Sequence, residues 1–468
     1  MFQLSERGYG VDKSRLSRSE LDQLYADLTV TPLVSNAVIK TAAPAIPLYM
    51  ESSKKIYIPK YYGLQKFGTP DVYKYPAIET VDVPFHGSLR EEQHEPVNAF
   101  LNAARDPVQA GGIINLACAS GKTVMALFIV SQLKVKTIIV VHKDFLLDQW
   151  RERIATFLPT ARVGLIKAKV TDVLGKDIVL ASLQSLAMKE YDLDVFKGIG
   201  FLIIDEVHRT GTEVFSQALK KLNMQITLGL SATVTRKDGM SKVFKWYIGD
   251  IVYKGKRKKQ NSVTVDLHKF WAKDTRYNKE ETIGYNKLNF SRMITNICAY
   301  KPRTDMICQK IITLLNDENA NTRRKILVLS ERKNHLAAIR DTLGELDSTV
   351  TTGFYYGGMS PSQLEESTKK DVLLGTFAMA SEGFDLKELD TLILATPKAC
   401  VEQAVGRILR ATENERTNNP VIVDIIDMFS IYERQAAKRR SLYIKCGFNI
   451  NSGETDGHHD TNVLFLDD

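Results

Sequence analysis

The chain has 468 residues and a mass of 52.7 kDa, which is more than one ordinary hydrophobic core holds, so we expect two or three domains. Apolar residues make up 44% of the sequence and charged residues 25%, a balance that excludes a fibrous, disordered or membrane-embedded protein. No apolar run reaches the roughly 18 residues of a membrane span, and the amino terminus lacks the apolar core of a signal peptide. We therefore expect a protein inside the cell, without a membrane partner. The net charge of +8 allows a polyanionic partner but does not require one.

The five cysteines show no paired spacing. This excludes a disulfide framework and a zinc site as expectations from the sequence. Reduced thiols are consistent with an intracellular location.

The predicted elements divide the chain into five parts. Residues 1–82, rich in Pro, Tyr and Lys without a helical period, predict a small irregular or β-containing accessory region. Apolar runs of strand length, each followed by a helical pattern, then recur in two groups: "TIIVV", "DIVLA", "FLIID" and "ITLGL", and later "KILVLS", "DVLLG", "TLILA" and "PVIVDII". Such alternation predicts an α/β fold with parallel sheets. We expect domains over 83–253 and 301–450, a polar and basic connector over 254–300, and a mobile tail over 451–468.

The stretch "NLACASGKTVMAL", from Asn115 to Leu127, has the order of a phosphate-binding loop. Gly121, Lys122 and Thr123 supply a turn, an ammonium for the β and γ phosphates and a hydroxyl for Mg²⁺. The run "GGIINL" before them reads as a strand, and "TVMALFIVSQL" after them reads as a helix. Because the expected early glycine is absent, a plain helix start is the alternative reading.

A second motif, "FLIIDEVHRTG", ends an apolar strand in Asp205 and Glu206. A nucleotide hydrolase needs one carboxylate to hold Mg²⁺ and a second to orient or deprotonate the attacking water. Ligands bind at the carboxyl ends of strands in open α/β sheets, which is where these two acids stand. An acidic turn after a buried strand is the alternative.

With "GLSAT" at Gly229–Thr233 and "QAVGRILR" at Gln403–Arg410, these motifs resemble those of superfamily 2 helicases of the DExH kind. The variant loop "LACASGKT" is similar to that of XPB-like helicases and of the compact helicases of poxviruses and other large DNA viruses. The resemblance implies two RecA-like parallel-sheet domains in tandem, an ATP and Mg²⁺ requirement, and a DNA partner. The short amino-terminal region makes the compact viral helicases the nearer comparison in architecture.

The resemblance also implies a role for each matching residue. The catalytic set is Lys122, Asp205, Glu206, Arg407 and Arg410, with Thr123 and Asp205 on the metal. The remaining ATP contacts are Gln93, for the adenine edge, with Cys118, Ala119, Ser120, Gly121, Gly383 and Asp385. Coupling residues are His208, Ser231, Thr233 and Gln403. Nucleic-acid contacts are His142, Lys143, Ser182, Gln184, Ser185, Ser330 and Arg332. Arg407 and Arg410, three residues apart, are expected on one helix face, from which they complete an ATP site on the first domain.

Two basic segments carry no assigned motif. The run "KGKRKK" at Lys254–Lys259 reads as a solvated linker, with a nucleic-acid contact or a nuclear address as alternatives. "ERQAAKRRSLYIKCGF", Glu433–Phe448, reads as a basic amphipathic helix whose charges turn to nucleic acid.

We therefore expect an ATP-dependent DNA helicase or translocase, moving 3′ to 5′ as the resemblance implies, in transcript release or DNA repair. An RNA-directed motor of the same fold is one alternative, because no motif tests for a 2′-hydroxyl. A P-loop kinase or small-molecule ATPase that ignores nucleic acid is another, and a nucleic-acid-binding module with an inactive ATP site is a third.

Overall fold

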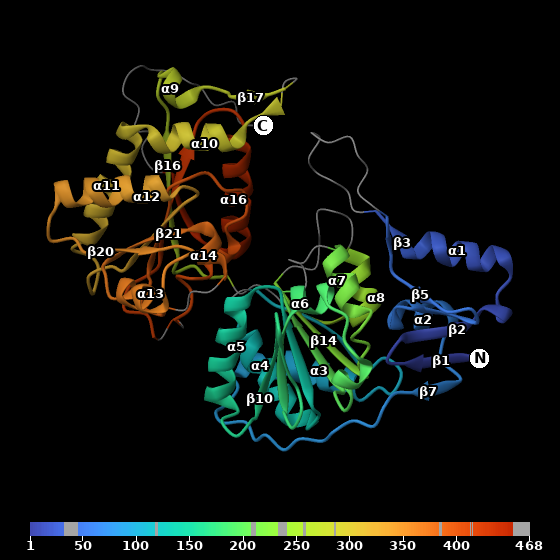
Figure 1. Cartoon of the computed structure of the whole chain (residues 1–468). Helices are drawn as coiled ribbons and strands as arrows, with labels where there is room; N and C mark the ends of the chain where they lie inside the picture. Colours follow the sequence, from blue (N-terminus) through green and yellow to red (C-terminus); the bar gives the residue numbers. More distant parts are fainter. Residues whose placement is uncertain are drawn as a thin grey trace. The chain divides into compact units, whose positions relative to one another are not determined.

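The computed structural model of the chain describes residues 1–31, 45–117, 120–206, 212–232, 241–255, 259–284, 287–382, 386–411, 413 and 415–452. It forms two compact units, Met1–Lys256 and Arg257–Asp468 (Figure 1). Within the described ranges, no helix combines the length and the apolar character that crossing a bilayer requires.

Unit 1, Met1–Lys256, is built on an eight-stranded sheet of order β11-β10-β12-β9-β13-β14-β8-β15. Its strands are β8 (Gly111–Asn115), β9 (Thr137–Val141), β10 (Val163–Lys167), β11 (Val170–Asp172), β12 (Ile178–Ser182), β13 (Phe201–Asp205), β14 (Ile226–Ser231) and β15 (Ile251–Lys254). All pairings are parallel except that of β10 with β11. The predicted parallel α/β fold is confirmed here.

Helices cover both faces of this sheet (Figure 1). They are α3 (Glu91–Ala104), α4 (Lys122–Leu133), α5 (Asp144–Phe157), α6 (Leu183–Met188), α7 (Thr212–Leu219) and α8 (Ser241–Ile248), with a short 3₁₀ turn at Leu193–Phe196. Alternate strand residues face opposite cores: Ile138 and Val140 pack with α6, α7 and α8, and Ile139 and Val141 pack with α3, α4 and α5. Burial on both faces explains why these strands read as continuous apolar runs.

The amino-terminal region is a β-containing module, which is one of the two forms predicted from the sequence. Its elements are β1 (Phe2–Ser5), β2 (Gly8–Asp12), β3 (Thr29–Val30), β4 (Ile46–Pro47), β5 (Met50–Glu51), β6 (Lys55–Ile58), β7 (Val72–Lys74), α1 (Arg18–Leu28) and α2 (Lys60–Phe67), with a 3₁₀ turn at Lys13–Arg15. Five of these strands form a sheet of order β5-β6-β2-β1-β7.

This module is fixed to the large sheet of unit 1 through α2. Lys60 Nζ donates to the Gln225 carbonyl at 2.9 Å, and the hydroxyls of Tyr61 and Thr227 are 2.7 Å apart. Buried residues of the module, such as Tyr9, belong to the same hydrophobic core as α6, α7 and α8. Because the core is continuous, we treat the module as part of unit 1.

Unit 2, Arg257–Asp468, contains a seven-stranded sheet of order β20-β21-β19-β22-β23-β16-β24, and every pairing in it is parallel. The strands are β16 (Thr264–Phe270), β19 (Ile326–Ser330), β20 (Thr352–Tyr355), β21 (Val372–Thr376), β22 (Thr391–Leu394), β23 (Val421–Asp427) and β24 (Asn449–Ser452). A two-stranded ribbon joins β17 (Thr282–Ile283) and β18 (Lys287–Leu288).

The helices of unit 2 again pack on both faces of their sheet. They are α9 (Thr275–Asn278), α10 (Phe290–Ala299), α11 (Lys301–Leu315), α12 (Lys333–Leu346), α13 (Pro361–Thr368), α14 (Phe377–Glu382), α15 (Glu402–Val405) and α16 (Tyr432–Cys446). One core holds α10, α11 and α12, and the other holds α14, α15 and α16. The predicted second parallel-sheet domain is confirmed.

Two predicted boundaries are corrected by the structure. The predicted connector over 254–300 contains β16, which pairs with β23 and β24 inside the sheet of unit 2, and α10, which packs in its core. Residues 451 and 452, predicted to start the tail, belong to β24. The rest of the predicted tail, 453–468, lies outside the described residues.

Candidate nucleotide site of unit 1

Three motifs meet at one edge of the sheet of unit 1, because their strands are neighbours. The order β13-β14-β8 places the carboxyl ends of these three parallel strands side by side. Ser231 at the end of β14 pairs with Asn115 at the end of β8, and Asp205 at the end of β13 pairs with Leu230. The predicted phosphate loop, the two acids and the Ser231 motif therefore share the edge at which α/β sheets bind ligands.

The loop after β8 turns into α4 at Gly121, whose φ of 74° lies in the left-handed region. Lys122 is 9% exposed, and its Nζ donates to the carbonyls of Leu116 at 3.1 Å and Ala117 at 3.2 Å. The Leu116 amide in turn donates to the Ser231 carbonyl at 3.0 Å. The hydrogen bonds that this ammonium makes to described residues go to carbonyl oxygens, for which an anionic phosphate would be a stronger replacement. The loop thus fits a nucleotide phosphate at a helix amino terminus.

Gln93 lies on α3 directly against this loop. It is 3% exposed, its Oε1 accepts from the Arg90 amide at 2.9 Å, and its Nε2 donates to the Ser120 carbonyl at 3.1 Å. A Cβ at Gly121 would overlap Gln93 Nε2, so glycine is required there for space as well as for its φ. Gln93 supports the loop in this structure, and its predicted contact with adenine stays a prediction.

Asp205 is the first acid of the pair at the end of β13. The pKa of Asp205 is raised to about 6, chiefly by burial and also by the adjacent Glu206, although Lys122 and a hydrogen bond from Trp150 act to lower it. The ammonium of Lys122 and the two carboxylates are therefore close enough to interact electrostatically. A cation that enters among these groups would relieve the repulsion between the acids, so the site fits Mg²⁺.

Glu206 follows with a φ of 50°, in the left-handed region that non-glycine residues rarely adopt. Such a conformation costs on the order of 1–3 kcal/mol and persists where surrounding structure enforces it, often at functional sites.

Trp150 is a site residue that the sequence analysis missed. Its Nε1 donates to Asp205 Oδ2 at 3.0 Å, and the residue is 2% exposed. The helical period of "DFLLDQWRERIATF" indicates that Leu146, Leu147, Trp150 and Ile154 share the buried face of α5, as they do. Nothing in that pattern shows which polar group the indole meets, because β13 lies 55 residues away in the sequence.

The predicted nucleic-acid contacts of unit 1 lie after β9 and β12. His142 and Lys143 follow β9, with Lys143 exposed before α5. Gln184 is exposed, whereas the Ser185 hydroxyl accepts from the Ala168 amide at 2.9 Å. Ser182 is 4% exposed, and its predicted phosphate contact stays a prediction.

In unit 2, Ser330 and Arg332 follow β19. Ser330 is fully buried, with its hydroxyl 3.1 Å from His335 Nδ1, so this structure does not expose it for the predicted phosphate contact. The guanidinium of Arg332 donates to the Ser291 carbonyl and hydroxyl, each at 2.8 Å, and to Thr295 Oγ1 at 3.2 Å. Arg332 is thereby tied to α10 rather than extended from the surface.

The segment "QAVGRILR" is only partly helical. Helix α15 ends at Val405, and turns continue through Leu409, so the expectation that Arg407 and Arg410 share one helix face is corrected. Arg407 is 8% exposed, and Gln403 and Arg410 are half-buried. The glycine at 406, which adopts a helical φ of −60°, follows the last helical residue and lowers the helix propensity there.

Six predicted site residues lie outside the described parts of the chain: Cys118, Ala119, His208, Thr233, Gly383 and Asp385. Their roles stay predictions from the motifs.

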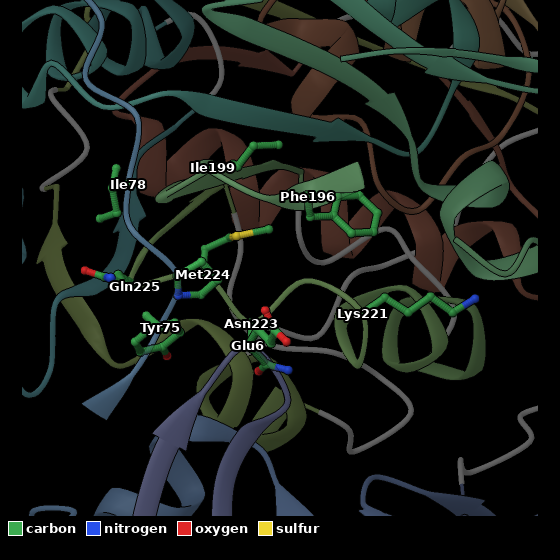
Figure 2. A pocket seen from close by; sticks show the side chains of 10 residues that line it. Glu6, Tyr75, Ile78, Phe196, Ile199, Lys221, Asn223, Met224 and Gln225 are labelled. Atoms are coloured by element: carbon green, nitrogen blue, oxygen red, sulfur yellow. The ribbon is translucent and has the colours of Figure 1, made fainter. Parts of the chain in front are cut away.

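A pocket of unit 1 lies at the other edge of the same sheet. Its lining includes Glu6 and Tyr75 of the amino-terminal module, Ile199 just before β13, and Met224 and Gln225 just before β14 (Figure 2). Because it adjoins the amino ends of these strands, it is separate from the edge that carries the motifs. The candidate nucleotide site is therefore the one at the carboxyl ends of the strands.

Comparisons with known proteins cover the region that contains this candidate site. A family model described as "Type III restriction enzyme, res subunit" matches residues 86–236, which include the loop after β8 and the two acids. A fragment of a type I restriction enzyme HsdR subunit from Vibrio vulnificus YJ016 has a similar fold, with a TM-score of 0.55 and 18% identity, covering 79% of this chain and 69% of the other.

Two viral proteins extend the similarity over most of the chain. A protein of Invertebrate iridescent virus 6, named as a helicase, is 25% identical over 400 residues, which are 80% of this chain and 84% of the relative. A protein of Acanthamoeba polyphaga mimivirus, named as an ATP-dependent RNA helicase, is 35% identical over 454 residues, which are 95% of this chain and 85% of the relative. The chain therefore belongs to the superfamily 2 helicases, in the group of viral helicases that includes this mimivirus protein.

Proposed function

We propose that the chain is an ATP-dependent DNA helicase or translocase, with 3′ to 5′ movement as its resemblance to XPB-like and compact viral DExH helicases implies. The observation that carries the ATPase part is the meeting of the Lys122 loop, Asp205 and Ser231 at the carboxyl ends of three adjacent strands. The similarity to relatives that are named as helicases supports the proposed action on nucleic acid. We place its action inside the cell, in transcript release or DNA repair, on the resemblance alone.

Each proposed role follows from the chemistry of the side chain. Lys122 neutralises phosphate charge, and Thr123 at the start of α4 offers a hydroxyl to Mg²⁺. Asp205 holds the metal, and Glu206 orients and deprotonates the attacking water. When bound, Mg²⁺ neutralises phosphate charge and polarises the bond to be broken. We assign Arg407 and Arg410 of unit 2 to the charge that develops in the transition state, so that hydrolysis requires both units.

We further propose that Trp150 is a positioning residue for Asp205. The indole fixes one carboxylate oxygen and, by its hydrogen bond, lowers the pKa of Asp205. Only deprotonated Asp205 binds Mg²⁺, so turnover at limiting Mg²⁺ should fall as the pH drops through about 6. In Trp150→Phe this acid limb should move to higher pH, because removal of the donor raises the pKa of Asp205. The measurement is the pH profile of ATP turnover at several Mg²⁺ concentrations.

Trp246→Phe is the matched control for this prediction. Trp246 of α8 instead packs edge-on against Tyr62 of α2, with ring centroids 5.0 Å apart. Loss of activity by general destabilisation would affect both variants without moving the acid limb. An acid limb at the same pH in Trp150→Phe and the parent protein would contradict the positioning role.

An RNA-directed motor is the second candidate, because the mimivirus relative is named as an RNA helicase. The family model for a restriction-enzyme subunit favours DNA. None of the predicted nucleic-acid contacts distinguishes ribose from deoxyribose, since hydroxyl, amide and ammonium donors suit the phosphates of either nucleic acid.

Strand displacement tests the proposal directly. Labelled duplexes of DNA, of RNA and of the hybrid, each with a 3′ or a 5′ tail, are incubated with the chain and Mg²⁺-ATP. We expect release of the labelled strand from 3′-tailed substrates that carry a DNA tracking strand, and none without ATP. Release from RNA duplexes alone would select the second candidate. A chain that hydrolyses ATP and follows single-stranded DNA without separating duplexes would be a translocase.

A further inference from the structure

Helix α16 of unit 2 has a basic stripe on its outer face, which we define as Arg434, Lys438 and Lys445. All three residues are exposed, and with the exposed Ser441 they follow the spacing i, i+4, i+7, i+11 of one helix face. The other side of the helix, which includes Ala436, Leu442 and Tyr443, is buried against the sheet core.

Arg439 lies in the same basic segment but has a different role. It is 1% exposed, its Nε donates to Asp424 Oδ1 and Oδ2 at 3.0 and 2.8 Å, and one of its terminal nitrogens donates to the Lys398 carbonyl. This cation therefore fixes α16 to β23. The charges of the stripe have no such structural use.

A second basic segment reaches the carboxyl-terminal end of α16. The backbone amide of Gln260 donates to the Cys446 carbonyl at 2.9 Å, which holds the chain after Lys259 against this end of the helix. A Cβ placed at Gly447 would meet the side chain of Lys259. Lys259 is exposed, and it adds a fourth cation at the carboxyl-terminal end of α16. Two segments nearly two hundred residues apart in the sequence are thus brought together.

The nearest acid in sequence is Glu433, which precedes Arg434 on α16, but the stripe forms no ion pair with an acid in the described parts of unit 2. Within the described parts of unit 2, the ion pairs include Lys301 with Asp305, Lys369 with Glu366 and Arg276 with Asp274. None of the ion pairs recorded there involves Arg434, Lys438, Lys445 or Lys259.

The helix dipole explains only part of this arrangement. Cations stabilise the carboxyl-terminal end of a helix, which accounts for Lys445 and Lys259. Arg434 instead lies in the first turn, where a cation is unfavourable, and Lys438 lies in the middle. A protein-binding surface would be expected to have an apolar centre that is poor in lysine, whereas Ser441 and Ala437 separate the charges here. A polyanion fits the stripe better than a protein.

We propose that the basic stripe, extended by Lys259, binds the sugar-phosphate backbone of the nucleic acid on which the motor acts. At 1.5 Å per residue the stripe spans about 16 Å, the axial length of about five nucleotides at 3.4 Å each. Its contacts carry no sequence information, since they address phosphates alone. The inference rests on the proposed function and adds a contact outside the helicase motifs.

The test is the salt dependence of nucleic-acid binding. Binding of a fluorescein-labelled single-stranded DNA and of the same-sequence RNA is measured between 50 and 200 mM salt. The stripe variant carries Arg434→Gln, Lys438→Gln and Lys445→Gln. The matched control carries Arg276→Gln, Lys301→Gln and Lys369→Gln, which removes the same net charge from cations that already have acidic partners.

In the stripe variant we expect the slope of log K against log salt to become shallower by about 2, because each of the three lost phosphate contacts contributes about 0.7. We expect the affinity to fall at least tenfold. In the control variant, the slope and the affinity should each change by no more than a third of the change in the stripe variant. If the triple variant melts early, Lys438→Gln alone should remove about 0.7 of the slope, and Lys438→Arg should restore it.

Equal slopes in the stripe and control variants would overturn the inference and leave the proposed motor intact, with an acidic protein as the next partner to test. A parent chain that binds neither DNA nor RNA would instead overturn the proposed function, and the inference with it.

Discussion

Glu206→Gln is expected to reduce ATP turnover by about 10² to 10⁴-fold, the range that a general base contributes. A glutamine side chain can still hold a water molecule by hydrogen bonding but cannot take its proton. Binding of ATP should be retained, because the loop contacts made by Lys122 and Gln93 do not involve Glu206. Steady-state turnover with saturating nucleic acid, together with binding of a fluorescent ATP analogue, gives both quantities.

Glu213→Gln provides the control for this substitution. Glu213 is exposed in the first turn of α7, in the same unit. Its substitution likewise replaces one carboxylate by an amide. It should keep parental turnover. Parental turnover in Glu206→Gln would show that another group takes the proton and would remove Glu206 from the proposed site.

Arg410→Ala is expected to lower turnover by about 10³ to 10⁵-fold, the contribution of an arginine finger to phosphoryl transfer. The affinity for ATP should change much less, because the guanidinium acts on charge that develops in the transition state. Arg407 is 8% exposed, so its substitution by alanine also leaves a buried void, and Arg410, which is half-buried, is the cleaner test. The measurements are the turnover number and the ATP dissociation constant.

Two further variants separate the effect of Arg410 on chemistry from an effect on folding. Arg410→Lys keeps the charge but loses the planar pair of donors, and it should recover only a small part of the lost rate. Arg340→Ala removes an exposed arginine of unit 2 that pairs with Asp341, and it should have parental turnover. A normal rate in Arg410→Ala would contradict the assignment of this residue to the ATP site.

The sequence predicted the two parallel sheets because their central strands are buried on both faces and read as continuous apolar runs. It failed at β16, whose residues "TVDLHKF" alternate between buried and half-buried positions. Half-exposed His268 and Lys269 made this strand look like part of a polar linker, although it pairs with β23 over seven residues. Pairing between distant segments is not visible in local composition.

The amino-terminal module shows the same limit. Its strands are two to five residues long, too short to produce a clear period. What fixes the module to unit 1 is a contact such as that of Lys60 with Gln225, which are 165 residues apart. The sequence indicated β-structure there but could not indicate the docking.

At the candidate site, motifs predicted the residues whose chemistry suits a nucleotide but not the residues that support them. Lys122 and Asp205 follow from loop and strand patterns, whereas the bond from Trp150 to Asp205 depends on how α5 packs. The full burial of Ser330 conflicts with its predicted contact with nucleic acid. In the basic segment, Arg439 is buried against Asp424, whereas the neighbouring basic residues are exposed. The number of charges in the segment does not predict which of them is buried.

The central claim is that ATP hydrolysis in this chain is coupled to nucleic acid. The most direct measurement is the ATP turnover of the whole chain at saturating Mg²⁺-ATP, with and without single-stranded DNA and with RNA as a parallel arm. We predict a turnover that rises at least tenfold when the nucleic acid is added, that is stimulated more by DNA than by RNA, and that weakens as salt increases. Turnover that is substantial without polynucleotide and unchanged by DNA and RNA would contradict the motor and identify an ATPase of another kind.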